Sequence, residues 1–68
     1  MSEHKIKVVI ADDSIRYRTI LRKLLEGNPQ IEVVGEAVNG IKALELIWDI
    51  LPDVILMDLE MPIMDGMT

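Results

Sequence analysis

The feature that most constrains the fold is an alternation of three short apolar runs with two segments of helical spacing. Each run is rich in Val, Ile or Leu and almost continuously apolar, which is typical of strands that are covered on both faces in a parallel sheet. The runs span Lys5–Ala11, Ile31–Val34 (continuing loosely to Val38) and Val54–Met57. The second run is short, and we expect it to lie at the edge of the sheet.

Both intervening segments carry helix signals. The first has an N-cap oxygen at Asp13 or Ser14 and a stop at Gly27, and the second has Asn39 as its cap and ends at Pro52. Helical spacing predicts two buried stripes, which comprise Tyr17, Ile20, Leu21, Leu24 and Leu25 in the first helix and Ala43, Leu44, Ile47, Trp48 and Leu51 in the second. The basic residues predicted to lie on the solvated face of the first helix are Arg16, Arg18, Arg22 and Lys23.

This order of elements predicts an α/β fold with parallel strands and right-handed crossovers. One helix should cover each face of the sheet, and the simplest spatial order of the strands is second, first, third. That arrangement is the opening β-α-β-α-β part of a doubly wound sheet.

Acidic residues stand at the ends of two of these strands. Asp12 and Asp13 terminate the first strand and Asp58 terminates the third. Parallel neighbours lie about 4.8 Å apart, so these side chains should share one crevice at the carboxyl end of the sheet. Carboxylates that converge in this way repel one another unless a cation intervenes, and oxygen ligands with room for water suit Mg²⁺. The alternative is that each Asp is a turn former or a helix cap.

Composition narrows the classes of protein to which the chain can belong. The 68 residues make at most one domain, and half of them are hydrophobic, which indicates a folded chain. There are no cysteines, which excludes disulfides and Cys-based metal sites. A net charge of −5 disfavours direct binding to nucleic acid, and no segment is typical of a signal peptide or a membrane span. We therefore expect a cytoplasmic module.

Three stretches of the sequence resemble a known family. VVIADDS after the first strand, VVGEAVNGIKALELI in the middle and VILMDLEMPIMDG after the third strand are similar to the receiver domain of two-component response regulators. The resemblance runs from about Ile6 to Thr68 and implies a partial flavodoxin-like fold. It also implies that residues 1–68 are the N-terminal half of one receiver domain. The string LEMPIMDGMT is similar to receivers of chemotaxis methylesterases, whereas VVGEA is equally typical of DNA-binding regulators.

The resemblance assigns roles to individual residues. It implies that Asp58 accepts a phosphoryl group from a sensor histidine kinase in a reaction that depends on Mg²⁺. Asp13 would bind the metal directly, Asp12 mostly through water, and Glu60 through its backbone carbonyl. The chain would then be a signalling module that is phosphorylated, and not an enzyme with a separate substrate. The hydroxyl residue and the lysine that later strands of a receiver contribute have no counterpart in these residues.

Two hypotheses stand beside the receiver function. An open, apolar edge on the third strand predicts self-association into a homo-oligomer that completes the sheet. A purely structural self-assembling half-domain without phosphotransfer is therefore the second hypothesis. The third is a phosphatase with an aspartyl nucleophile, in which Glu60 would be the general acid. The basic face of the first helix is either solvated or a docking face for the kinase, and we expect His4 to be solvated without a role.

Overall fold

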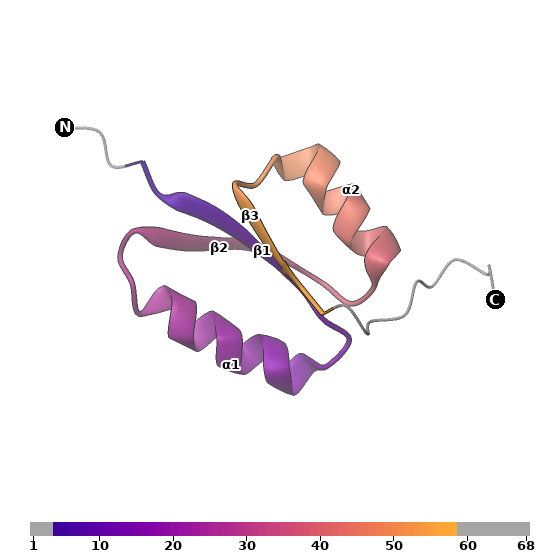
Figure 1. The fold of residues 1–68 in the computed structure, drawn as a ribbon, viewed down its shortest axis with the longest axis horizontal. Coiled ribbons are helices and arrows are strands. Elements are labelled where there is room, and N and C mark those ends of the chain that lie inside the picture. Colours follow the sequence, from indigo (N-terminus) through magenta and orange to yellow (C-terminus); the bar gives the residue numbers. More distant parts are fainter. Residues whose placement is uncertain (1–3, 59–68) are drawn as a thin grey trace.

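A computed structural model of the chain describes residues 4–58. It contains five elements in the predicted order: β1 (Ile6–Ala11), α1 (Ile15–Glu26), β2 (Ile31–Ala37), α2 (Gly40–Ile50) and β3 (Val54–Met57). The strands form one parallel sheet in the order β2-β1-β3, which confirms the predicted topology. The helices α1 and α2 lie on opposite sides of this sheet (Figure 1).

The central strand β1 is the core of the molecule. Its last four residues are at most 3% exposed, because β2 and β3 flank the strand and a helix covers each of its faces. Val8 and Ile10 face α1, where Leu21 and Leu25 pack against them, while Ala11 faces the α2 side with Ala43. Burying one such Ile or Leu side chain stabilises the fold by about 1.5–3 kcal/mol. The near-continuous apolar run is therefore what selects the central position for this strand.

The second strand contains a β-bulge, and it covers most of the loose continuation that was predicted to Val38. It runs to Ala37, and its pairing with β1 shifts by one residue between Val8↔Val33 and Val9↔Gly35, so that Val34 is the extra residue. The bulge turns Gly35 toward α2, where a Cβ atom would lie only 3.2 Å from Cδ1 of Leu46. Glycine thus lets the helix approach the sheet closely at this point.

The caps agree with the sequence. Ser14 caps α1 with its side chain, which accepts a hydrogen bond from the Tyr17 N–H, and Asn39 does the same for α2 through the Lys42 N–H. Gly27 is the C-cap of α1. Pro52 would allow α2 to continue to Leu51, but the helix ends at Ile50. Leu51 is its C-cap and has the left-handed conformation, with φ 54°.

Part of the predicted helix burial is wrong. In α2 the side of the helix that meets the sheet carries Ala43 and Leu46, so Leu44 and Trp48 point outward and are 54% and 78% exposed. The physical reason is that α2 is apolar around most of its circumference, and helical spacing then does not determine which stripe packs. The other members of the predicted stripes that are half or more exposed are Ile20, Leu24 and Leu51, with Tyr17 at 49%.

Arg18 is the other correction. It was expected on the solvated face of α1, but it is only 7% exposed. Within the described residues, no helix is long and apolar enough to cross a membrane.

Candidate functional site

The site lies where β1 and β3 end side by side. Ala11 is paired with Met57, so the next residue on each strand, Asp12 and Asp58, stand next to each other. The backbone N–H of Asp58 donates to the Ala11 carbonyl at 3.1 Å, and that of Asp12 donates to the Ala37 carbonyl of β2 at 3.0 Å. These bonds extend the strand pairing to the acidic residues themselves, so the backbone of both is held in the sheet.

Three carboxyl groups converge at this point. Asp12, Asp13 and Asp58 each offer a carboxylate oxygen, and these oxygens all lie within 4.8 Å of one another. Asp12 is buried, Asp58 is partly buried and Asp13 is exposed. The sequence predicted that these residues share one crevice, and the structure brings them together. Glu60 lies outside the described residues.

A turn contributes to the position of Asp12. Its Oδ1 accepts a hydrogen bond from the Ser14 N–H at 2.8 Å, while the Ser14 Oγ accepts one from the Tyr17 N–H at 3.2 Å. This is the turn-forming role that was the alternative to metal binding. It accounts for one oxygen of Asp12, but not for the presence of two further carboxylates within 4.8 Å.

The electrostatics of the cluster favour a cation. Two unit charges 4.8 Å apart repel by about 0.9 kcal/mol even at the dielectric constant of water, and by more where the surroundings are less polar. The positive end of the α1 dipole, at Ile15, lies next to the cluster and offsets only part of this repulsion. The donor set consists of hard carboxylate oxygens, with an exposed member that leaves room for water. Its chemistry fits Mg²⁺, which takes one or two carboxylates together with waters.

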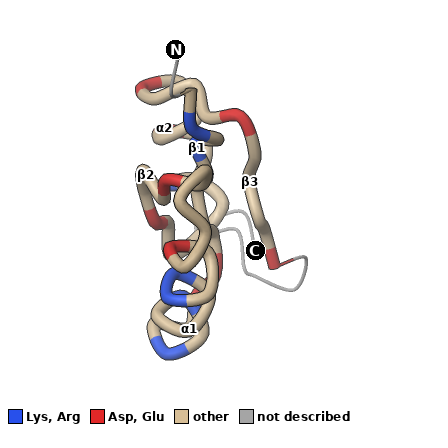
Figure 2. The backbone as a smooth tube through the Cα atoms, turned by 90° about the vertical axis from the view of Figure 1, so that its left-hand side faces the viewer, with Lys and Arg blue, Asp and Glu red and all other residues tan. Residues whose placement is uncertain are grey.

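A groove adjoins the carboxylates. It has a volume of about 780 Å³ and lies between α1 and β3, where its floor and walls include Tyr17, Leu21 and Leu56. Figure 2 shows acidic segments at both ends of β3, and only the end that carries Asp58 opens on this groove. The acidic residue at the other end is Asp53, whose N–H donates to the Lys7 carbonyl at 2.9 Å. His4 is near that end and is solvated as expected, with its Nε2 4.0 Å from Asp53.

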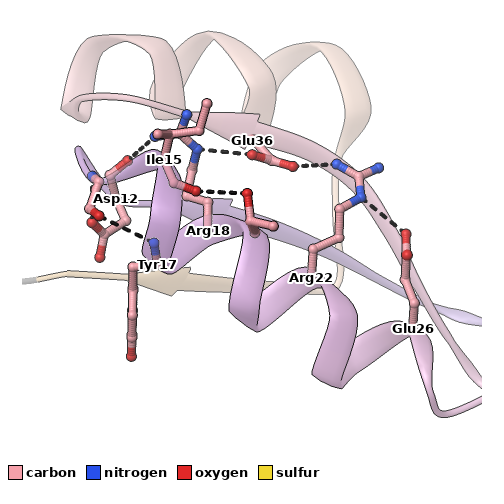
Figure 3. Close-up of polar contacts among 9 residues, drawn as sticks. Asp12, Ile15, Tyr17, Arg18, Arg22, Glu26 and Glu36 are labelled. Carbon is pink, nitrogen blue, oxygen red and sulfur yellow. Dashed lines mark hydrogen bonds and ion pairs between the residues drawn. The ribbon is translucent and has the colours of Figure 1, made fainter.

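A second polar cluster was not predicted. Arg18, Glu36, Arg22 and Glu26 form a chain of ion pairs that starts at the Asp12 carbonyl (Figure 3). The hydrogen bond from Arg18 keeps the pKa of Glu36 below its usual value, even though burial opposes this shift, and Glu36 raises the pKa of Arg22 in turn. The sequence carries a signal for the burial of Arg18, but none for its partner Glu36. Arg18 stands three residues before Leu21 and seven before Leu25, and therefore shares their buried face.

The chain matches one family model over most of its length. The model is that of the response regulator receiver domain, and it covers residues 8–68. A protein-glutamate methylesterase/protein-glutamine glutaminase of Carboxydothermus hydrogenoformans is 52% identical over 94% of the chain. One from Rhodopseudomonas palustris is 47% identical over 100% of the chain. The chain spans only 18% and 19% of these two relatives.

Solved structures agree with the sequence comparison. The response regulator domain of Thermotoga maritima CheB superposes with a TM-score of 0.85 at 40% identity, over 93% of this chain and 47% of that one. The complex of the P1 domain of CheA3 with CheY6 from R. sphaeroides gives a TM-score of 0.78 at 38% identity, over 94% of this chain and 50% of that one. The arrangement of strands and helices around the acidic cluster is thus shared with these structures.

Proposed function

The chain belongs to the response regulator receiver domain family, and from that premise we propose that Asp58 accepts a phosphoryl group during two-component signal transduction. The observation that carries the proposal is the convergence of Asp12, Asp13 and Asp58, with carboxylate oxygens within 4.8 Å of one another. A receiver works in signalling as a switch module, so we propose that the chain catalyses no reaction on a separate substrate. Since the ATP that supplies the phosphoryl group is cytoplasmic, the proposal places the chain in the cytoplasm.

Asp58 is the nucleophile of the proposed reaction. A carboxylate oxygen of Asp58 attacks the phosphorus atom of a phosphohistidine, the new O–P bond forms and the N–P bond breaks. The electron pair of the broken bond stays on the imidazole nitrogen, which takes up a proton. The product is an acyl phosphate. Asp58 is suited to this attack because it is partly exposed at the rim of the groove.

Asp12 and Asp13 would hold Mg²⁺ together with Asp58. A divalent ion supplies positive charge that offsets the repulsion between the nucleophile and the phosphoryl oxygens. The turn at Ser14 already holds one oxygen of Asp12, which leaves its other oxygen and the exposed Asp13 to face the ion. We also propose the backbone carbonyl of Glu60 as a ligand, on the strength of the family resemblance.

We propose a sensor histidine kinase as the partner. Support comes from the similarity to CheY6 in its complex with the P1 domain of CheA3. A candidate contact surface is the outer face of α1, where basic Arg16 and Lys23 are exposed. Ile15 and Leu24 lie at opposite edges of this face and are 69% and 70% exposed. Exposed apolar side chains beside charged ones are typical of a docking surface.

Intact mass tests the proposed function directly. After incubation with acetyl phosphate and Mg²⁺, the chain should gain the mass of one phosphoryl group, and omission of Mg²⁺ should remove most of that gain. Asp58→Asn should remove it completely, whereas Asp49→Asn, the same change on an exposed residue of α2, should leave it intact. An adduct that persists in Asp58→Asn would overturn the assignment of the acceptor. Turnover of a phosphate ester would instead support the phosphatase hypothesis.

A second candidate function is self-assembly. Within residues 4–58, β3 pairs with β1 on one side only, and its Val54 and Met57 are 41% and 45% exposed. An unpaired strand edge of this kind recruits another strand. We propose that two chains pair through β3, and sedimentation velocity should then show a dimer at micromolar concentration. A monomer over the whole concentration range would refute the pairing without affecting phosphorylation.

A further inference from the structure

Arg18 is a buried cation next to the acidic site. Arg18 is only 7% exposed. Its guanidinium connects α1 with the end of β1 and with β2 (Figure 3). Nη1 donates to the backbone carbonyl of Asp12 at 2.6 Å, and Nε donates to Oε1 of Glu36 on β2 at 2.9 Å. A charged side chain is almost never buried to this extent unless it is paired, and here one of the two partners is the backbone of Asp12, a residue of the site.

The bond to the Asp12 carbonyl determines the orientation of a whole peptide unit. The Asp12 carbonyl and the Asp13 N–H belong to one planar group, so holding the carbonyl holds the plane from which the Asp13 side chain departs. On the other side of Asp12, its own N–H is held by the Ala37 carbonyl at 3.0 Å. Its side chain is held by the Ser14 N–H at 2.8 Å. Arg18 therefore supplies a contact from α1 that orients the link between the two acids.

The β-bulge is what brings Glu36 to Arg18. Successive side chains of a strand alternate between faces, so Glu36, three residues after Val33, would face α2 in a regular strand. The extra residue Val34 changes the register, and Glu36 is paired with Ile10, whose side chain faces α1. One inserted residue thus turns a carboxylate toward the buried guanidinium.

The network is balanced in charge. Arg18 and Arg22 each donate to one oxygen of Glu36, and Arg22 also pairs with Glu26 at 3.0 Å. Two cations and two anions give the network no net charge, but the member that touches Asp12 is the cation Arg18. A geometric effect and an electrostatic effect of Arg18 on Mg²⁺ binding therefore have to be separated by experiment.

We propose that Arg18 is a positioning residue for the Mg²⁺ site, acting through the Asp12 carbonyl while Glu36 holds its guanidinium. This inference rests on the proposed function, because it takes the three aspartates to be the metal ligands. Loss of an outer-sphere contact to a metal ligand typically weakens metal binding by about 10–100-fold. We expect the lower part of that range, because the contact is to the backbone of Asp12 and two other contacts remain.

The test measures Mg²⁺ affinity by isothermal titration calorimetry for the chain and three variants. Arg18→Gln removes the charge and the bond, Arg18→Lys keeps the charge but replaces the planar fork, and Arg22→Gln removes a charge that does not touch Asp12. If only charge mattered, Arg18→Gln would bind Mg²⁺ more tightly and Arg18→Lys would be unchanged. The positioning role predicts that Arg18→Gln and Arg18→Lys both bind Mg²⁺ about tenfold more weakly than the unmodified chain. The Mg²⁺ affinity of Arg22→Gln should stay within about twofold of that of the unmodified chain.

The outcomes separate this inference from the proposed function. If the unmodified chain gives no saturable Mg²⁺ binding, the metal site itself is wrong, and the positioning role falls with it. If the chain binds Mg²⁺ and Arg18→Lys binds it equally tightly, the metal site stands and the positioning role is overturned. Thermal unfolding by circular dichroism confirms that each variant is folded. Should Arg18→Gln not fold, the comparison of Arg18→Lys with Arg22→Gln still decides.

Discussion

Removing one charge from the acidic cluster should stabilise the metal-free fold. In Asp13→Asn the exposed carboxylate is replaced by an amide of the same shape, and its repulsion from Asp58 is lost. Its repulsion from Asp12 contributes little, because these two residues are neighbours in the chain and repel each other in the unfolded state as well. At a separation of 4.8 Å the Asp13–Asp58 pair repels by about 0.9 kcal/mol in water. Screening in 0.1 M salt, where the Debye length is about 10 Å, reduces this to about 0.5 kcal/mol. In a domain of this size that corresponds to an increase in Tm of about 2–4 °C.

Added Mg²⁺ should make the Tm of the unmodified chain higher than that of Asp13→Asn. A ligand at ten times its Kd stabilises the folded state by about 1.4 kcal/mol, so the Tm of the unmodified chain should rise by several degrees. Asp13→Asn lacks one ligand and should gain much less. Circular dichroism melts with and without Mg²⁺ measure both effects, with Asp49→Asn as the control for a lost surface charge. A lower Tm for metal-free Asp13→Asn, or an equal response of both proteins to Mg²⁺, would refute the electrostatic account of the site.

The other predictions concern the network and the core. The hydrogen bond from Arg18 lowers the pKa of Glu36, so ionised Glu36 stabilises the fold above its ordinary pKa of 4.5. This stabilisation is lost as the pH falls through the lowered pKa of the folded state. In Glu36→Gln the free energy of unfolding, measured by urea titration, should therefore fall less steeply below about pH 4.5. Ile10→Ala should cost about 2–5 kcal/mol in the same assay, because Ile10 is 0% exposed. Trp48→Ala should change the free energy of unfolding by less than about 0.5 kcal/mol, because Trp48 is 78% exposed. A large loss in Trp48→Ala would mean that this face of α2 is covered.

The sequence predicted the strands, their order and the location of the acidic cluster. These features depend on local signals: a continuous apolar run selects the central strand, and Asp12 and Asp58 follow runs whose parallel pairing brings their ends together. The caps at Ser14 and Asn39 were predictable for the same reason, since the side chain bonds to a backbone group three residues away.

The features that the sequence did not predict depend on distant contacts. Helical spacing is compatible with a buried Trp48, which is exposed in the structure. The face of α2 that packs against the sheet is the one with Ala43, because its small side chain lets the helix approach closely. Arg18 was assigned to the solvated face because its partner, Glu36, is 18 residues away and faces it only through a bulge in β2. A bulge has no marker in a run such as IEVVGEA beyond its glycine. The ion-pair network therefore required the structure.

The most direct test of the account is where a bound divalent ion lies. Mn²⁺ in place of Mg²⁺ broadens the NMR signals of nearby amides, so one titration of isotope-labelled chain maps the ion. The account predicts that the amide signals of Asp13 and Asp58 disappear together at low Mn²⁺, while that of Asp53 at the opposite end of β3 stays sharp. Broadening at only one of the two strand ends, or first at Asp53, would contradict a shared metal site.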